Sequence, residues 1–162
     1  MHNNQEFQWP IRVYYEDTDA GGVVYHSQYL NFLERARTEW LRHLGFEQTD
    51  LRDNLKVMIV VHSLQIAFKK SAKFNDLLIV KSQLTALGNS SWQCTQHIYR
   101  SNQLLGSDLD SDLGSDLRCN LGNEMGDELL IHAQVKLAFI NSQSFKPARI
   151  PAAILFVAKT LI

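Results

Sequence analysis

The sequence predicts one α+β domain in which an antiparallel β-sheet wraps around a single long helix. Three observations favour this class: one extended amphipathic helical pattern, a strand-like segment before it, and four strand-like segments after it. An amphipathic helix must bury its apolar stripe, and the sheet offers the surface for it. At 162 residues the chain is long enough for one compact domain, so residues 1–162 are taken as a single unit.

The central helix is predicted over residues 28–44. Its apolar side chains recur at intervals of three and four residues, as one face of a helix requires: Leu30, Leu33, Ala36, Trp40, Leu41 and Leu44. Ser27 stands at the N-cap position, and Gly45 fits the end of the helix. Trp40 is expected in the core.

Strands are predicted on both sides of this helix. Residues 11–17 alternate and are rich in β-branched and aromatic side chains, and two glycines then permit a turn at residues 18–22. The later strands are predicted at residues 57–68, 77–87, 92–99 and 129–140. The tail, residues 152–162, is predicted to be helical.

Residues 102–126 are predicted to be an inserted hairpin connection that interrupts this pattern. Within it, Ser107 to Leu117 contains three copies of Ser-Asp-Leu, an acidic low-complexity repeat without a core-forming period. Asp108, Asp110 and Asp112 have the spacing of a calcium-binding EF-hand loop. The sixth position holds Leu113 instead of glycine and the twelfth holds Cys119 instead of glutamate, which argues against calcium.

Composition narrows the classes of function. The formal net charge of −1 gives no reason to expect nucleic acid as a partner. No secretory signal and no apolar run of about 20 residues is visible, so no transmembrane segment and a cytoplasmic location are expected. Two cysteines provide no disulfide framework. His62, His97 and His132 lie on separate predicted strands without metal-ligand spacing, so no metal is expected.

The stretch from Tyr14 to His26, YYEDTDAGGVVYH, concentrates the chemistry. Acidic side chains, a glycine turn and a histidine all precede a helix N-terminus, where backbone amides are unpaired and carry the positive end of the helix dipole. Such amides can hold an oxyanion formed at a carbonyl, and a nearby carboxylate can attack it or deprotonate a water. Helix capping and an ordinary turn explain the same residues without catalysis.

The segment RVYYEDTDAGGVVYHSQYLNFLERARTEWLRHLGF resembles the 4-hydroxybenzoyl-CoA thioesterase-like hotdog family, and within it the YbgC-type branch associated with the bacterial Tol–Pal envelope system. The resemblance continues more loosely through VVHSLQIAFKKSAKFNDLLIV and FKPARIP. It breaks at the Ser-Asp-Leu repeats, where the family usually has a tight hairpin. It implies a hotdog fold and hydrolysis of acyl-coenzyme A.

The resemblance also implies roles for particular residues. Asp19 matches the family's catalytic carboxylate, His26 matches a histidine at the start of the helix, and Tyr15 matches a tyrosine that lines the site. The thioester carbonyl is expected over the helix N-terminus, so backbone amides near Tyr25 to Ser27 are the candidates for the oxyanion site. The resemblance implies active sites at a dimer interface, and therefore a homodimer or homotetramer.

Other charged residues have less specific readings. Coenzyme A carries phosphates, and Lys69, Lys70 and Lys73 with Arg149 are candidates to bind them, although lysines at strand ends are often only solvated. Glu34 can orient a water or a neighbouring side chain, or it can form a surface ion pair with Arg37. Asp17 is expected to cap the turn.

Three functions of different classes remain in view. The first is acyl-CoA hydrolysis by Asp19, with no cofactor beyond the coenzyme A of the substrate. The second is a hotdog dehydratase or hydratase, which needs a different acid–base pair that the sequence does not offer. The third is a non-catalytic module that binds acyl-CoA or acyl carrier protein, or serves the envelope machinery. The acyl group, and coenzyme A against acyl carrier protein, stay open.

Overall fold

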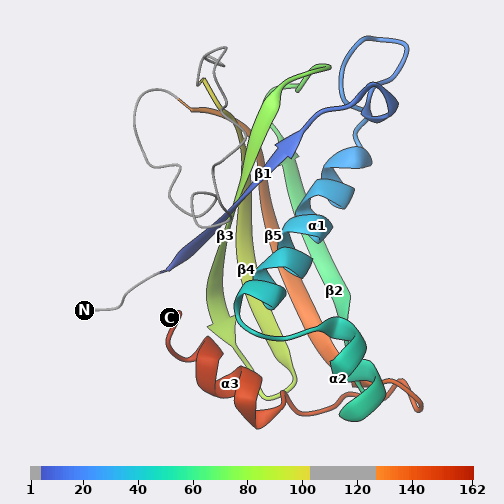
Figure 1. Cartoon of the computed structure of the whole chain (residues 1–162), viewed down its shortest axis with the longest axis vertical. Coiled ribbons are helices and arrows are strands. Elements are labelled where there is room, and N and C mark those ends of the chain that lie inside the picture. The colour runs from blue at the N-terminus through green and yellow to red at the C-terminus, as the bar shows by residue number, and fades with distance from the viewer. Residues whose placement is uncertain (1–4, 103–126) are drawn as a thin grey trace, which may run out of the picture.

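The computed structural model describes residues 5–102 and 127–162 (Figure 1). The Ser-Asp-Leu repeats lie outside the described residues, and so do the aspartates that were considered for calcium binding and most of the predicted insertion. In the described parts, five strands build one antiparallel sheet, and a long helix lies along one of its faces. The predicted α+β architecture is confirmed.

The sheet has the strand order β1-β3-β4-β5-β2. Its strands are β1 (Glu6–Arg12), β2 (Val57–Phe68), β3 (Leu77–Leu87), β4 (Ser91–Arg100) and β5 (Glu128–Asn141). The four strands predicted after the helix are thus confirmed to within a residue at each end. Although β2 and β3 are successive in sequence, they do not pair: β2 pairs with β5 at one edge, and β1 pairs with β3 at the other.

The central helix α1 (Gln28–His43) matches its prediction apart from its last residue. Ser27 occupies the N-cap position as predicted, but its side chain makes no capping hydrogen bond. After the helix, Gly45 adopts a φ of 90°, a left-handed conformation that favours glycine. The amide of Phe46 then donates to the carbonyl oxygen of Leu41 at 3.0 Å, which closes the helix end.

The prediction of a strand over residues 11–17 is wrong in its position. The strand β1 ends at Arg12, and Tyr15–Asp17 form a single 3-10 turn, η1. Residues 11–17 do alternate as a strand would. The Asp17 carboxylate, however, accepts a hydrogen bond from the Tyr14 amide at 2.8 Å, and this local bond bends the chain. Pro10 lies within β1, an edge strand, where a missing amide donor is tolerated.

Two short helices complete the fold. Helix α2 (Gln48–Asn54) follows α1 and was not predicted, because its seven residues contain a single buried apolar side chain, Leu51. Helix α3 (Ala152–Ala158) confirms the helical tail over part of its predicted length. None of the helices in the described residues is both long and apolar enough to cross a membrane.

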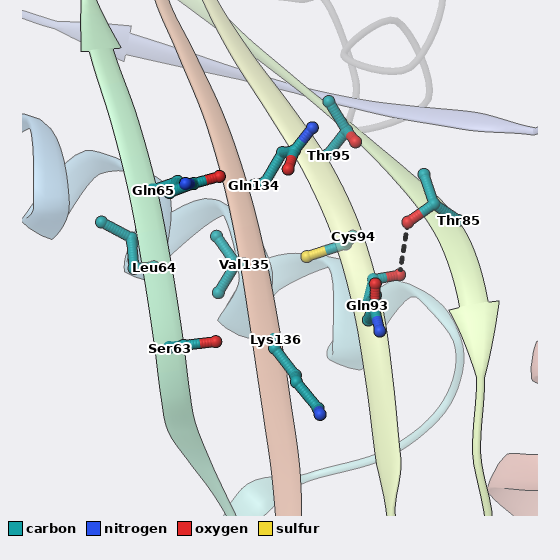
Figure 2. Close-up of a pocket in the computed structure, with 10 residues that line it drawn as sticks. All are labelled: Ser63, Leu64, Gln65, Thr85, Gln93, Cys94, Thr95, Gln134, Val135 and Lys136. Atoms are coloured by element: carbon teal, nitrogen blue, oxygen red, sulfur yellow. Dashed lines mark hydrogen bonds between the residues drawn. The ribbon is translucent and has the colours of Figure 1, made fainter.

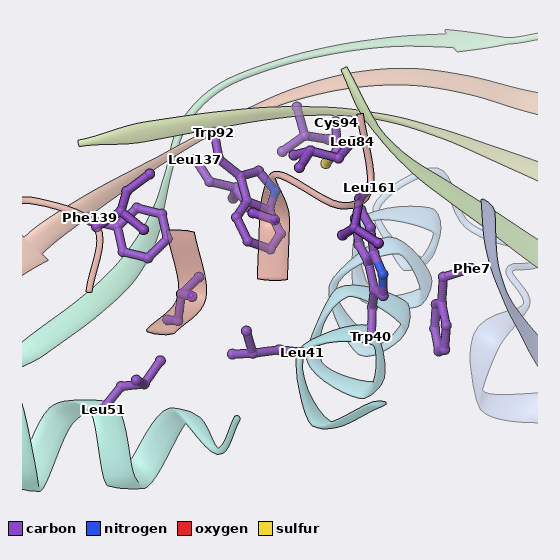
Figure 3. Close-up of a cluster of buried hydrophobic side chains, with 14 of the residues drawn as sticks. Phe7, Trp40, Leu41, Leu51, Leu84, Trp92, Cys94, Leu137, Phe139 and Leu161 are labelled. Atoms are coloured by element: carbon purple, nitrogen blue, oxygen red, sulfur yellow. The ribbon is translucent and has the colours of Figure 1, made fainter. Parts of the chain in front are cut away.

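The core lies between α1 and the sheet. Figure 3 shows Trp40 and Leu41 of α1 facing Trp92 and Phe139 of the sheet. The rings of Trp40 and Trp92 meet edge to face with centroids 5.6 Å apart, an arrangement worth about 0.5–1.5 kcal/mol beyond the buried area. Trp40 is 2% exposed, so its predicted core position is confirmed. The strands' alternation places these side chains on the helix-facing side.

A second buried cluster fixes the N-terminal half of α1. Phe32, Leu33 and Ala36 are fully buried and belong to the same cluster as Val80 and Ile98 of the sheet. Burial of a large apolar side chain contributes about 1.5–3 kcal/mol. The start of the helix, where the candidate chemistry lies, is therefore held rigidly against the sheet.

One polar group is buried beneath α1. Gln96, on β4, is fully buried; its amide nitrogen donates to the Leu33 carbonyl oxygen at 3.1 Å and to the Ser82 hydroxyl at 2.9 Å. Its carbonyl oxygen accepts from Nη1 of Arg37 at 2.8 Å. Burial lowers the pKa of Arg37. Because buried polar groups need partners, this network links α1 to two strands.

Replacing Gln96 by leucine is expected to lower the free energy of unfolding by about 1–3 kcal/mol, because Arg37 and Ser82 lose a buried partner. Urea denaturation measures the change. Gln93→Leu is the matched control, since Gln93 lies on the same strand but is exposed, and it should change stability by less than about 0.5 kcal/mol. Equal losses in both variants would contradict the structural role given to Gln96.

Candidate active site

Asp19 lies in a tight turn closed by an isolated antiparallel bridge between Thr18 and Val24. The Asp19 amide donates to the Val23 carbonyl oxygen at 3.0 Å, and the Gly22 amide donates to the Asp19 carbonyl oxygen at 3.0 Å. Gly22 has a φ of 74°, where a side chain would be strained. The turn therefore requires glycine at this position, and its backbone bonds hold Asp19 in place.

The Asp19 carboxylate is held at one oxygen and open at the other. Oδ1 accepts a hydrogen bond from the Gly21 amide at 2.8 Å. A Cβ atom at position 21 would lie 3.0 Å from this same oxygen, so glycine permits the close approach. Oδ2 has no hydrogen-bond partner among the described residues, and the side chain is exposed. One carboxylate oxygen is thus oriented while the other can reach a ligand.

Asp17 ties this turn to the start of α1. It is 3% exposed, its Oδ2 accepts from the Tyr14 amide at 2.8 Å, and its carbonyl oxygen accepts from the Tyr25 amide at 2.9 Å. The Asp17 side chain therefore caps the 3-10 turn η1 and not the turn at residues 18–22 that was predicted for it. The buried Asp17 therefore fixes the chain both before and after Asp19.

The N-terminus of α1 presents backbone donors next to this turn. The Tyr25 amide already donates to Asp17, so it is not available to an oxyanion. The amides of His26 and Ser27 have no acceptor within the described parts of the chain. Unpaired amides at a helix start, with the positive end of the dipole, favour negative charge. The predicted range of amides is therefore narrowed to these two.

The side chains at this helix start are accessible. His26 and Tyr25 are both exposed, and their rings lie 4.4 Å apart between centroids. The Ser27 hydroxyl makes no capping bond. None of these three side chains has a hydrogen-bond partner among the described residues, so all three are available beside the two unpaired amides.

Tyr15 lies at the outer side of the turn. It is 80% exposed, and its ring meets Phe74 edge to face with centroids 5.6 Å apart. In the strand predicted over residues 11–17, either Tyr14 or Tyr15 would have faced the core, but Tyr14 is also 63% exposed. Both residues lie at the 3-10 turn instead of on a strand, so the alternation of a strand does not apply to them.

The loop after β2 brings three lysines beside the helix start. The Val24 amide donates to the Ala72 carbonyl oxygen at 2.8 Å, and the Ala72 amide donates to the Tyr29 hydroxyl at 2.9 Å. Lys73 also forms an isolated bridge with Val23. These contacts join the loop directly to the candidate site.

The four cations proposed for phosphate binding differ in their surroundings. Lys70 forms an ion pair with Glu128, which lowers the pKa of that carboxyl. The side chains of Lys69 and Lys73 are exposed, and neither forms an ion pair with another described residue. Arg149 precedes Ile150, whose amide donates to the Asn89 carbonyl oxygen in the β3–β4 hairpin. The segment that leads into α3 lies at the opposite end of the fold from the start of α1 (Figure 1).

Glu34 and Arg37 do not form the ion pair that the sequence analysis considered. The Glu34 carboxylate accepts from the Thr38 hydroxyl at 2.7 Å, whereas Arg37 donates to Gln96. Cys94 offers no nucleophile either, because burial raises the pKa of its thiol to about 11.

Two of the three histidines examined for metal binding meet across the sheet. Nδ1 of His132 and Nε2 of His97 lie 2.9 Å apart on neighbouring strands, while His62 lies at the bulge of β2. No cluster of three or more histidine, cysteine, aspartate or glutamate side chains suited to a metal ion occurs among the described residues.

A broad groove in the described part of the chain lies away from this site. It has a volume of about 500 Å³ and crosses β2, β5, β4 and β3 on the face that points away from α1 (Figure 2). Uncharged polar side chains such as Gln65, Gln134 and Thr95 dominate it, with Lys136 at one end. It contains neither Asp19 nor the helix amides, so its size does not make it the site of chemistry.

A curved antiparallel sheet around one helix, with an oriented carboxylate beside the helix N-terminus, defines the class of hotdog-fold thioester hydrolases. The chain belongs to the Thioesterase superfamily, whose model matches residues 21–107. The resemblance drawn from the motif is thereby confirmed.

Known proteins agree with this membership. The chain is 46% identical over 99 residues to the acyl-CoA thioesterase YbgC of Haemophilus influenzae, which covers 61% of this chain and 73% of that protein. A solved structure of a probable thioesterase from Bartonella henselae is 30% identical, covers 91% of this chain and all of that one, and superposes with a TM-score of 0.72. A 4-hydroxybenzoyl CoA thioesterase in complex with 4-hydroxybenzoyl CoA shares the fold, with 13% identity, 94% and 98% coverage and a TM-score of 0.75.

Sequence reasoning missed two features of the site. It did not identify Asp17 as the buried link between the turn and α1, since a buried carboxylate has no signature beyond its position in the motif. It also missed Phe74, which packs on Tyr15, because the loop after β2 gave no sign of folding back against the turn.

Stability is expected to fall as the solution is acidified, because of His97. Burial lowers the pKa of His97, and the neighbouring His132 lowers it further. The unfolded chain therefore binds a proton near pH 6.5 before the folded chain does, so stability is lost as pH falls from about 7 through the folded pKa, by at most about 1.4 kcal/mol per pH unit. Urea denaturation at several pH values measures this slope.

His97→Gln should flatten the slope. The control is His62→Gln, because His62 is exposed and the same substitution there should leave the slope unchanged. If His97→Gln and the native chain lose stability equally on acidification, the assignment to His97 is wrong.

Proposed function

We propose that this chain hydrolyses acyl-CoA with the Asp19 carboxylate as nucleophile or general base, and with the His26 and Ser27 amides as the oxyanion site. The activity itself follows from the family and from the relatives: the chain is an acyl-CoA thioester hydrolase. The roles of the individual residues are what we propose here.

One observation carries this assignment. An exposed carboxylate with one oriented and one open oxygen stands in a rigid turn that is bonded directly to a helix start with two unpaired amides. The amides and the dipole stabilise negative charge on a carbonyl oxygen, and the carboxylate supplies the attack on its carbon. The neighbouring carboxylate of Asp17 lacks this combination, because it is buried, its Oδ2 accepts from the Tyr14 amide, and the backbone carbonyl oxygen of Asp17 accepts from the Tyr25 amide.

In the reaction, the thioester carbonyl oxygen lies over the His26 and Ser27 amides. The open oxygen of Asp19 either adds to the carbonyl carbon or removes a proton from a water that adds. The tetrahedral oxyanion then collapses, the carbon–sulfur bond breaks, and the coenzyme A thiolate leaves and takes up a proton. In the nucleophilic route, water then hydrolyses the mixed anhydride and regenerates Asp19. In this proposal His26 contacts the carbonyl or the departing group, and Tyr15 lines the entrance.

The lysines of the neighbouring loop fit the other end of the substrate. Lys69 and Lys73 are exposed beside the turn without an ion-pair partner among the described residues, so their charge is available to the phosphates of coenzyme A. Lys70 is a weaker candidate, because binding would compete with Glu128.

We also propose that the chain acts as a homodimer or a pair of such dimers. Strand β2 is an edge of the sheet, and its Val61 and Phe68 are each 50% exposed. An exposed apolar edge strand is a template for pairing, and pairing with the same edge of a second copy would cover it. Sedimentation equilibrium distinguishes a mass of one, two or four chains. A cytoplasmic location stays a prediction.

A carrier-protein substrate or a purely binding role is the second candidate. It is favoured only if the native protein binds acyl groups without releasing free thiol from acyl-CoA.

Asp19→Asn is expected to reduce kcat by about 10²–10⁴, because the substitution keeps the size of the side chain but removes its negative charge and basicity. Release of free thiol from a panel of acyl-CoA substrates measures the rate. Circular dichroism verifies that the fold is intact.

The matched control for Asp19→Asn is Glu16→Gln, since Glu16 is an exposed carboxylate in the 3-10 turn η1, which directly precedes the turn that holds Asp19. It should keep nearly full activity. Equal rates for Asp19→Asn and the native chain would remove Asp19 from the mechanism, and equal losses in both variants would indicate a general effect of charge.

A further inference from the structure

His97 and His132 meet on the face of the sheet that points away from α1. They are cross-strand partners of β4 and β5. The neighbours of His97 on β4, Gln96 and Ile98, are fully buried on the helix side, and both neighbours of His132 on β5 are fully buried as well. Because side chains alternate along a strand, the two imidazoles lie on the opposite face. The register of the sheet therefore unites two histidines that are far apart in the sequence.

The two rings have the spacing of neighbouring metal ligands. Nδ1 of His132 and Nε2 of His97 are 2.9 Å apart. Imidazole nitrogens bind zinc at about 2.0–2.1 Å, and two ligands at right angles at that length are roughly 2.9 Å from each other. A square-planar or octahedral ion of similar size therefore fits these nitrogens once the rings turn so that both lone pairs point at it.

The protonation of the pair suits a metal ion. An imidazole must be deprotonated at the nitrogen that binds the ion. Burial lowers the pKa of His97, and the neighbouring His132 lowers it further, so His97 favours the neutral form. The second nitrogen of each ring has no hydrogen-bond partner among the described residues, so it can carry the one proton of the neutral ring.

The surroundings supply oxygen atoms and a balanced charge. The next row on the same face holds Thr95 and Gln134, cross-strand partners that line the broad groove shown in Figure 2. Their oxygens, or water, can complete the coordination of an ion. Lys81 lies opposite His97 on β3, but its Nζ is 3.8 Å from the Glu6 carboxylate, which offsets its positive charge.

We propose that His97 and His132 form a binding site for a divalent transition-metal ion of the Ni²⁺ or Cu²⁺ class, held across β4 and β5 on the outer face of the sheet. Imidazole binds these ions in preference to magnesium or calcium, and the right-angle spacing favours square-planar or octahedral geometry over tetrahedral. The site is separate from the proposed function, because the sheet lies between it and α1.

Calorimetric titration of the full chain, without an affinity tag, with nickel(II) chloride tests the proposal. His97→Phe and His132→Phe each keep an aromatic ring but remove both nitrogens. Each substitution is expected to raise the dissociation constant for Ni²⁺ at least about tenfold, because one of two imidazole ligands is lost. Magnesium chloride should show no binding at this pair, since Mg²⁺ prefers oxygen ligands.

The double variant shows whether the two histidines hold the same ion. If they do, the variant with both substitutions should bind Ni²⁺ no more weakly than either single variant, because the loss of one ligand already removes the shared site. His62→Phe is the matched control. His62 is an exposed histidine on β2 in the same sheet, and its substitution should leave the affinity unchanged.

Equal Ni²⁺ affinity in the native chain and in both single variants overturns the proposal, and so does an equal loss in His62→Phe. Circular dichroism verifies that the variants fold. A second measurement needs no variant: in ¹H–¹⁵N spectra of the native imidazoles, diamagnetic Zn²⁺ should shift His97 Nε2 and His132 Nδ1 together and leave His62 in place. Unchanged signals from the pair at saturating Zn²⁺ and Ni²⁺ binding elsewhere would also overturn it.

Discussion

Burial of the apolar face of α1 is the constraint on which the rest of the structure depends. The helix has to be enclosed along sixteen residues, and five strands curve around it to do so. The fully buried Phe32, Leu33 and Ala36 show that the side of the helix that faces the sheet is completely covered in the half nearest the turn. Because the helix start cannot shift, its unpaired amides have fixed directions, and electrostatic stabilisation of a transition state requires such fixed dipoles.

The turn before the helix gains its order from Asp17. Its side chain holds the chain entering the turn and its carbonyl oxygen holds the chain leaving it, so Asp19 lies on a short loop whose two ends are joined at one residue. The buried Asp17 thereby fixes the position of the exposed Asp19 carboxylate relative to the start of the helix. Gly21 and Gly22 are needed for different reasons, the first for close approach and the second for its backbone conformation.

Much of this could be predicted from the sequence. Regular periodicity identified α1 and the four later strands, because a helix face and a strand face each leave a repeated apolar pattern that a long element makes unambiguous. The errors lie where tertiary contacts override that pattern. Tyr14 and Tyr15 alternate like strand residues, but the hydrogen bond to Asp17 bends them into a turn, and α2 is too short to show a period. Which amides remain unpaired depends on the contact between Tyr25 and Asp17, which no local pattern reveals.

The pairing at the far ends of β4 and β5 has an evolutionary consequence. Arg100 and Glu128 are cross-strand partners joined by an ion pair, and Arg100 also binds Asp76 at 2.8 Å. The two strand ends are thus held together by contacts that do not involve the sequence connecting them. Each doubling of a connecting loop costs only about 0.6 kcal/mol in closure entropy. A longer connection at this point of the gene therefore costs the fold little free energy, and the same point suits the insertion of a reporter peptide.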